Sequence, residues 1–248
     1  MQRQVYTATV TRSVMLSEPT QTKHIEFAVQ ELKRFDFIPG QFVSMTAPRN
    51  GKTMTRAYSL ASGPRGNNQF DLCLNRVSDG FFSNFLCDMK EGDTIAFNGP
   101  HGNFVLRSPL RDSLLIATGT GVAPMRGFVE WLFDSSNRDR HQGKQIHLVY
   151  GTRYPSDVYY EDFFRRIATE NLNFHYVVTL SRGPDEWSGS RGYVQERVRE
   201  IILARPEQER KNMDAYICGL NNMISANRKM LQQELGWEKR QIIYERYD

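Results

Sequence analysis

The chain is 248 residues long, with 40% hydrophobic residues, 24% charged residues and a formal net charge of +4, values typical of one large or two small globular domains. No stretch approaches the about 20 consecutive apolar residues of a membrane-spanning helix, and the start lacks the apolar run of a secretory signal, so we expect a cytoplasmic protein. No basic run with interleaved aromatic residues is present, which argues against nucleic acid as a partner, while the mild positive excess favours an acidic one.

The first part of the chain reads as a series of short β-strands. Brief runs rich in β-branched and aromatic residues are separated by Gly, Pro, Asn and Asp, a pattern typical of an antiparallel barrel or sandwich. The predicted strands are 5–16, 24–29, 40–47, 56–62, 69–77 and 93–99. One helix interrupts them, and we predict that it is capped by Ser83, runs from Asn84 to Met89 and ends before Gly92.

After Pro109 the pattern changes to strands that alternate with helices. The predicted strands are 114–118, 146–150, 174–180, 215–218 and 242–246, with helices near 125–133, 157–170, 193–204 and 222–235. This alternation predicts a doubly wound parallel sheet with helices on both faces, in which ligands lie at the carboxyl ends of the strands. We therefore predict two domains, 1–108 and 109–248.

Two segments of the first domain carry candidate binding chemistry. Arg56, Tyr58 and Ser59 supply a cation, a flat aromatic ring and a small hydroxyl, which a flavin needs; an ordinary strand with an exposed arginine is the alternative. Gly80 leads into a predicted helix start at Ser83, where unpaired N–H groups favour an anion. Helix capping alone would explain the same residues.

Three segments of the second domain follow predicted strands. The loop from Gly119 to Pro124 resembles a pyrophosphate site at a helix N-terminus, although a tight turn explains GxG equally well. Ser181, Arg182, Arg191 and Tyr193 could bind a phosphate monoester and an adenine, or form a solvated loop. Cys218 and Gly219 end a strand, where a cysteine is usually a small buried hydrophobe.

The cysteines, Cys73, Cys87 and Cys218, are too few for an iron–sulfur cluster, which normally takes four thiolates. No CxxC, HExxH or GxSxG pattern occurs, so we expect neither a metal site nor a serine hydrolase. Any one-electron chemistry would therefore need an organic cofactor, with the second redox centre on a partner.

Taken together, the segments resemble the plant-type ferredoxin–NADP reductase family in its bacterial-like form. The segments that carry the resemblance, in the family's order, are RAYSLAS (56–62), LCLNRV (72–77), FFSNFLCDMKEGD (81–93), NGPHGNF (98–104), GTGVAPMRGF (119–128), SRGPDEW with RGYVQ (181–195), YICGLNNM (216–223) and YERYD (244–248). The resemblance implies an FAD-binding antiparallel β-barrel followed by an NADP-binding α/β domain.

The resemblance also implies residue roles. The residues that would hold FAD are Arg56, Tyr58, Ser59, Cys73, Leu74, Asn75, Gly80, Phe82 and Ser83, with Tyr58 stacked on the flavin and Ser59 near its N5. The residues that would hold NADP(H) are Thr120, Gly121, Ser181, Arg182, Arg191, Tyr193 and Gly219. Catalysis would involve Ser59, Cys218, Glu245 and Tyr247, and the Tyr247 ring would cover the flavin until nicotinamide displaces it.

The implied activity is hydride transfer between nicotinamide C4 and flavin N5, with electrons exchanged singly with an acidic carrier protein, ferredoxin or flavodoxin. We expect the protein to be a monomer. Two departures from the family pattern stand out: Arg191 replaces the lysine of the plant enzymes, and Asp248 follows Tyr247. Two alternatives stay open. One is an NAD(P)H-dependent reductase component of an oxygenase system, and the other is a non-catalytic subunit that binds flavin and nucleotide.

Overall fold

The computed structural model describes residues 4–136 and 139–247; Asp248, one of the two departures noted above, lies outside the described residues. The polypeptide divides into two compact units. One comprises the chain up to Val105 together with Arg126–Trp131, and the other comprises Leu106–Met125 and the chain from Leu132 onward. The two segments 106–125 and 126–131 meet inside a single helix, α2 (Val122–Leu132).

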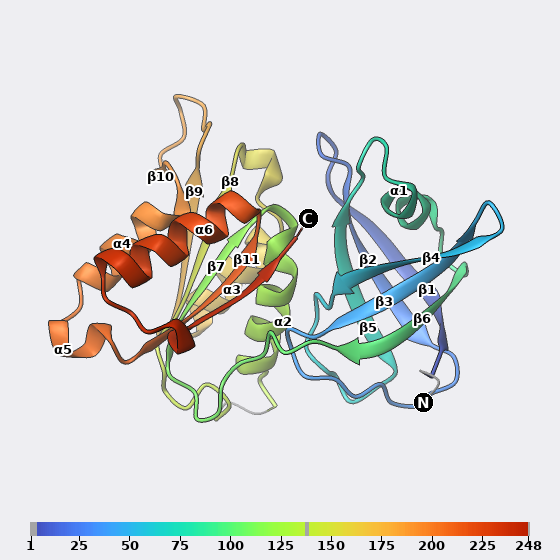
Figure 1. The fold of residues 1–248 in the computed structure, drawn as a ribbon, viewed down its shortest axis with the longest axis horizontal. Coiled ribbons are helices and arrows are strands. Elements are labelled where there is room, and N and C mark those ends of the chain that lie inside the picture. The colour runs from blue at the N-terminus through green and yellow to red at the C-terminus, as the bar shows by residue number, and fades with distance from the viewer. Residues whose placement is uncertain (1–3, 137–138, 248) are drawn as a thin grey trace. The chain divides into compact units, whose positions relative to one another are not determined.

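The first unit is a six-stranded antiparallel sheet that closes into a barrel (Figure 1). Its strands are β1 (Tyr6–Ser17), β2 (Thr22–Val29), β3 (Phe42–Arg49), β4 (Lys52–Ser59), β5 (Gln69–Asn75) and β6 (Thr94–His101), in the spatial order β4-β3-β6-β1-β2-β5. A bridge between Leu60, just after β4, and Leu72 of β5 joins the two edge strands. This closure satisfies backbone groups that an open edge would expose.

Aromatic side chains fill the barrel. Phe35, Phe70 and Phe97 contact one another with ring centroids 5.2 to 5.6 Å apart, and Phe27 stacks on Phe70 at 5.3 Å. In β2, Ile25, Phe27 and Val29 are fully buried at alternate positions, because successive side chains of a strand point to opposite faces. The alternate hydrophobic residues from which such a strand is predicted are therefore the residues that form the core of the barrel.

The helix of the first unit, α1 (Phe81–Asp88), begins earlier than the sequence predicts. Its N-cap is Gly80, so the prediction that Ser83 caps the helix is wrong. The Ser83 hydroxyl instead accepts a hydrogen bond from the Val77 N–H (3.0 Å) and donates one to the Gly80 carbonyl (3.1 Å). These bonds fix the turn before the helix and let Phe81 and Phe82 enter its first turn.

The second unit is a six-stranded, wholly parallel sheet of order β10-β9-β8-β7-β11-β12. Its strands are β7 (Asp112–Thr118), β8 (Ile146–Thr152), β9 (Phe174–Leu180), β10 (Ser190–Arg191), β11 (Met213–Gly219) and β12 (Ile242–Arg246). Its remaining helices are α3 (Glu161–Glu170), α4 (Val194–Leu203), α5 (Glu207–Arg210), α6 (Asn221–Lys229) and a π-helical turn, η3 (Met230–Glu234).

Helices cover both faces of this sheet. Figure 1 shows α4 and α6 side by side across one face, where Val198 and Ile224 pack with Ile116 and Val177. On the other face, Phe164 of α3 contacts Tyr176 of β9, with ring centroids 5.1 Å apart. Because Tyr176 and Val177 are neighbours in one strand, they point to opposite faces. The predicted barrel followed by a parallel α/β sheet is confirmed.

A buried ion cluster fixes the last residues of α2 within the first unit. Asp71 of β5 is fully buried, and its carboxylate accepts two hydrogen bonds from Arg65 (3.0 and 2.5 Å) and one from Arg126 of α2 (3.1 Å). Arg126 also donates to the Ala61 carbonyl at 2.5 Å. Burial raises the pKa of Asp71, but the hydrogen bonds and charge of Arg65, with the charge of Arg126, outweigh it and hold the pKa below its usual value.

His24 lies beside this cluster, and its buried position leads us to expect that acid lowers the stability of the barrel. Burial, with a smaller contribution from the Arg126 and Arg65 charges, lowers its pKa from 6.5 to about 4, although the carboxylates of Asp71 and Glu26 oppose the shift. Between pH 6.5 and about pH 4, His24 is therefore protonated in the unfolded chain but neutral in the folded chain. The free energy of unfolding consequently decreases as the pH is lowered through this range.

We expect the wild type to lose about 1 kcal/mol more stability than His24→Asn when the pH is lowered from about 7.5 to about 5.5. Urea unfolding at both pH values measures this difference. Equal losses in the two proteins would show that His24 does not cause the acid sensitivity.

No helix in the described parts of the chain is both long and apolar enough to cross a bilayer.

Candidate functional site

In the first unit, β4 presents the predicted flavin motif. Tyr58 is partly buried, its ring centroid lies 6.2 Å from that of Phe82 in α1, and burial is the main reason that its pKa rises to about 12. The phenol therefore stays neutral and offers an uncharged flat face. Arg56 is exposed and donates to the Thr55 carbonyl (2.9 Å), whereas Ser59 is buried on the opposite face of the strand.

The neighbouring strand β5 supplies the other predicted residues of this unit. Cys73 and Leu74 are both buried, and Asn75 at the end of the strand is partly exposed. Of these side chains, that of Asn75 alone is open to solvent and to a ligand. Cys73 and Leu74 contribute to the packing that holds the strand in place.

The N-terminus of α1 fits a phosphate group. The first N–H groups of a helix have no acceptor within the helix, and no side chain of the described residues caps this one. A Cβ on Gly80 would lie 2.7 Å from the Ser83 hydroxyl, so a side chain at this position would push the hydroxyl away from its bonds in the turn. The free N–H groups and the helix dipole together favour the pyrophosphate of a dinucleotide such as FAD.

In the second unit, the loop between β7 and α2 forms a comparable site. Residues Gly119–Gly121 form a 3-10 turn, and a Cβ on Gly121 would overlap the Cys218 carbonyl group, lying 2.6 Å from its carbon. A Cβ on Gly219 would overlap the Thr118 hydroxyl in the same way. The ends of β7 and β11 are thus in direct backbone contact, and Thr120 is left partly exposed at the start of α2.

Three of the predicted catalytic residues come together at the ends of β11 and β12. Cys218 is paired in register with Glu245, and the Tyr247 N–H donates to the Gly219 carbonyl at 3.2 Å. The Tyr247 side chain lies near the Cys218 thiol. Burial, reinforced by the Glu245 charge, raises the pKa of that thiol well above its usual value, so it stays protonated.

The predicted phosphate-binding residues follow β9. The Ser181 and Arg182 N–H groups donate to the Thr152 and Arg153 carbonyls (3.0 and 3.1 Å), and Arg182 is exposed. The ring of Tyr193 is 62% exposed and free to stack on a ligand.

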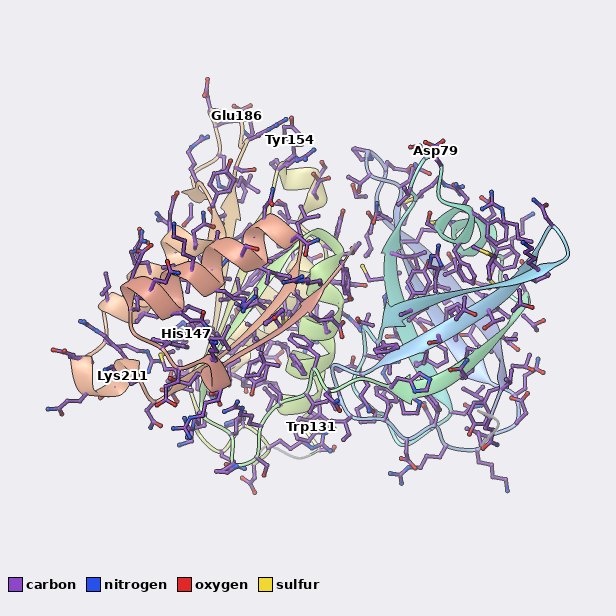
Figure 2. All side chains as sticks on the ribbon, in the orientation of Figure 1. Asp79, Trp131, His147, Tyr154, Glu186 and Lys211 are labelled. Carbon is purple, nitrogen blue, oxygen red and sulfur yellow. The ribbon has the colours of Figure 1, made fainter. Side chains whose placement is uncertain are left out.

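Other residues lie at the same end of the sheet. Figure 2 shows Tyr154, just after β8, and Glu186, after β9, at one end of the second unit, with His147, near the start of β8, at the other. Arg153 is exposed directly after β8 and is not among the residues predicted from the sequence. Its position after a predicted strand was the signal that could have found it.

Two family models match the chain. The oxidoreductase FAD-binding domain matches residues 7–106, and the oxidoreductase NAD-binding domain matches residues 115–229. The chain is also 37% identical over 232 residues to ferredoxin–NADP reductase B of Sorangium cellulosum, with 91% of each protein covered. The chain belongs to the ferredoxin–NADP reductase family.

Within this family the chain also resembles larger proteins. It is 29% identical to the electron transfer component of anthranilate 1,2-dioxygenase from Acinetobacter baylyi, with 92% of this chain but 63% of that protein covered. A solved cytochrome P450 reductase from Amycolatopsis superposes with a TM-score of 0.83 at 26% identity, covering 98% of this chain and 69% of that one. The chain thus spans about two thirds of each of these two relatives.

The family membership gives the two candidate sites their ligands. The barrel is an FAD-binding domain, and the parallel sheet belongs to a domain that binds a pyridine nucleotide. The predictions of a flavoprotein oxidoreductase, of its fold and of its family are confirmed. The N-terminus of α1 and that of the 3-10 turn after β7, neither of which is capped by a side chain of the described residues, fit the dinucleotides.

Proposed function

We propose that the protein is an NADPH-dependent reductase of a one-electron carrier, ferredoxin or flavodoxin. The observation that carries this proposal is the similarity to ferredoxin–NADP reductase B, which extends over 91% of both chains. The exposed cation Arg182, which lies after a strand of the nucleotide-binding sheet, supports a donor that carries a 2′-phosphate. We further propose that the enzyme acts as a cytoplasmic monomer, and that residues 1–108 carry its FAD site and residues 109–248 its NADP site.

The proposal assigns tasks to residues of the first unit. Bound FAD would supply a hydride acceptor at N5 and release its electrons one at a time. Tyr58 would offer its neutral ring to the flavin, Arg56 would neutralise phosphate charge, and Ser59 would hold a hydroxyl near N5. Gly80 and Ser83, which form the turn before α1, would keep the helix N-terminus open for the pyrophosphate.

Residues of the second unit would hold the nucleotide. Gly121 and Gly219 let the loop after β7 and the end of β11 approach each other closely, and Thr120 would contact the pyrophosphate of the nucleotide. Because the Cys218 thiol stays protonated, it would act as a neutral neighbour of the nicotinamide and not as a nucleophile. Glu245 and Tyr247 would orient this thiol.

A second candidate function is an NADH-dependent reductase component of an oxygenase. The similarity to the electron transfer component of anthranilate 1,2-dioxygenase favours it, although the match covers 63% of that protein. The two functions differ in the preferred nucleotide and in the carrier that accepts the electrons.

Anaerobic mixing of the yellow enzyme with NADPH or NADH tests the proposal. We expect much faster bleaching by NADPH, and Arg182→Gln should raise the KM for NADPH by about 10- to 100-fold, the worth of one charge-assisted phosphate contact, without changing that for NADH. Arg166→Gln, which replaces an arginine 57% exposed on α3, is the control and should change neither KM. Faster bleaching by NADH would refute the NADPH assignment.

A further inference from the structure

Tyr150 of β8 places its hydroxyl between two turns at the carboxyl end of the parallel sheet. The side chain is fully buried, and its ring centroid lies 6.4 Å from that of Tyr159. The hydroxyl donates to the Gly119 carbonyl in the turn after β7 (3.1 Å) and to the Asp157 carbonyl in the 3-10 turn η2, Pro155–Asp157, after β8 (3.2 Å). A phenol has one proton to donate, so the two carbonyls share it.

This contact orients the peptide group between Gly119 and Thr120. The peptide is trans, and the C=O and N–H of a planar trans peptide point in opposite directions. Because the Gly119 C=O is directed at the buried Tyr150 hydroxyl, the Thr120 N–H is directed away from it. The Thr120 N–H is also among the first N–H groups of a helical turn, which have no acceptor within that turn. The orientation therefore leaves this donor for a bound anion.

The Gly119 carbonyl also belongs to the start of α2. The Val122 N–H donates to the carbonyls of Gly119 and Thr120. Gly119 has a φ of +54°, and a glycine reaches many backbone conformations at little cost, so its own residue type does not hold this one. The Tyr150 hydroxyl supplies a bond that does, and it comes from the protein interior.

The same hydroxyl secures the turn after β8. In that turn the Asp157 N–H donates to the Tyr154 carbonyl and the Val158 N–H to the Pro155 carbonyl, each at 3.1 Å. Both turns follow neighbouring parallel strands, since β7 pairs with β8. The Tyr150 hydroxyl thus links the backbone of the two turns at the end of the sheet where ligands bind.

We propose that Tyr150 is a positioning residue for the pyridine nucleotide, whose hydroxyl holds the Gly119–Thr120 peptide so that the Thr120 N–H faces the pyrophosphate. The inference rests on the proposed function for the contact between Thr120 and the pyrophosphate. It does not depend on which nucleotide the enzyme prefers, because NADPH and NADH carry the same pyrophosphate. Tyr150 is buried and acts through Gly119.

The variant Tyr150→Phe, which removes the hydroxyl and keeps the ring, tests this role in the full-length enzyme. We expect the KM values for NADPH and NADH to rise by the same factor, about 3- to 10-fold for the loss of one hydrogen bond, with kcat nearly unchanged. In the nucleotide-free enzyme, amide hydrogen exchange of Val122 and Val158 should accelerate about threefold or more, because both N–H groups donate within the linked turns.

Tyr216→Phe is the matched control. Tyr216 of β11 is also fully buried, and its hydroxyl accepts a hydrogen bond from the Arg107 N–H at 2.9 Å. Both variants lose a buried hydroxyl, so we expect similar decreases in stability towards urea. Tyr216→Phe should change neither KM nor the exchange of Val122 and Val158. An unchanged flavin spectrum shows that the FAD-binding unit is intact in both variants.

Three outcomes would overturn the inference: unaltered KM values in Tyr150→Phe, an equal rise in Tyr216→Phe, or unchanged exchange of Val122 and Val158 in Tyr150→Phe. A rise confined to one nucleotide would also contradict it, because the pyrophosphate is common to both. A wild-type preference for NADH would refute the proposed NADPH-dependent function alone. The exchange measurement uses no nucleotide, so it still decides whether Tyr150 holds the two turns.

Discussion

Replacing Gly121 by alanine is expected to lower kcat/KM for the pyridine nucleotide by about 100-fold while FAD remains bound. The added Cβ would overlap the Cys218 carbonyl group, which belongs to the backbone and cannot rotate away. The loop after β7 must then separate from the end of β11, and both the helix N-terminus and the Cys218 thiol move. Steady-state kinetics with the preferred nucleotide, together with the flavin absorbance, measures the effect.

Gly119 provides the matched control in the same turn. It has a φ of +54°, yet no atom of the described chain would lie within 4 Å of an added Cβ. Gly119→Ala should therefore cost about 1 kcal/mol of backbone strain and change kcat/KM far less than Gly121→Ala does. If the two variants lose the same activity, the close approach of Gly121 to Cys218 does not explain the effect of Gly121→Ala.

Replacing Asp71 by alanine should destabilise the FAD-binding unit by about 3 kcal/mol, because it removes the buried counter-charge of Arg65 and Arg126 and leaves them paired with the partly exposed Glu130. Asp71 is fully buried, and the Arg65 and Arg126 side chains are 29% and 14% exposed. Urea unfolding followed by far-ultraviolet circular dichroism and by release of the flavin measures the loss.

Asp88→Ala is the comparison for this variant. Its ion pair with Arg76 has the same 2.5 Å separation as the Asp71–Arg65 pair, but the Asp88 side chain is 69% exposed. An exposed pair is worth at most about 1 kcal/mol because water screens it. Similar losses in Asp71→Ala and Asp88→Ala would contradict the view that burial makes the Asp71 cluster strong.

The spacing of hydrophobic residues predicted most of the fold, because the residues that repeat at strand or helix spacing are the ones that the strands and helices bury. The predicted strands 174–180 and 242–246 have the bounds of β9 and β12, and both belong to a sheet whose faces are covered. The start of α1 was missed because serine is a stronger N-cap than glycine in general. At this turn the Ser83 hydroxyl is occupied by Val77 and Gly80 instead.

The short motifs of the candidate sites were predicted from the sequence, but the contacts of their side chains with residues far away in the chain or with backbone carbonyls were not. Arg126 lies in the GTGVAPMRGF segment, yet its partner Asp71 is 55 residues away in a strand of the barrel. No local pattern indicates such a pair, because strand pairing and helix docking decide it. Likewise, the sequence marks Arg191 as a cation but cannot indicate that its donors face backbone carbonyls.

The division of α2 bears on how such a chain can be cut or recombined. The barrel is not encoded by one continuous stretch, since Arg126–Trp131 belongs to it although these residues follow the nucleotide loop. A fragment that ended at Val105 would carry Asp71 without Arg126. A gene exchange at the apparent boundary would likewise join an aspartate from one parent to an arginine from another. The unit that must be inherited together is therefore the barrel and the six-residue helical segment 126–131, and not the barrel alone.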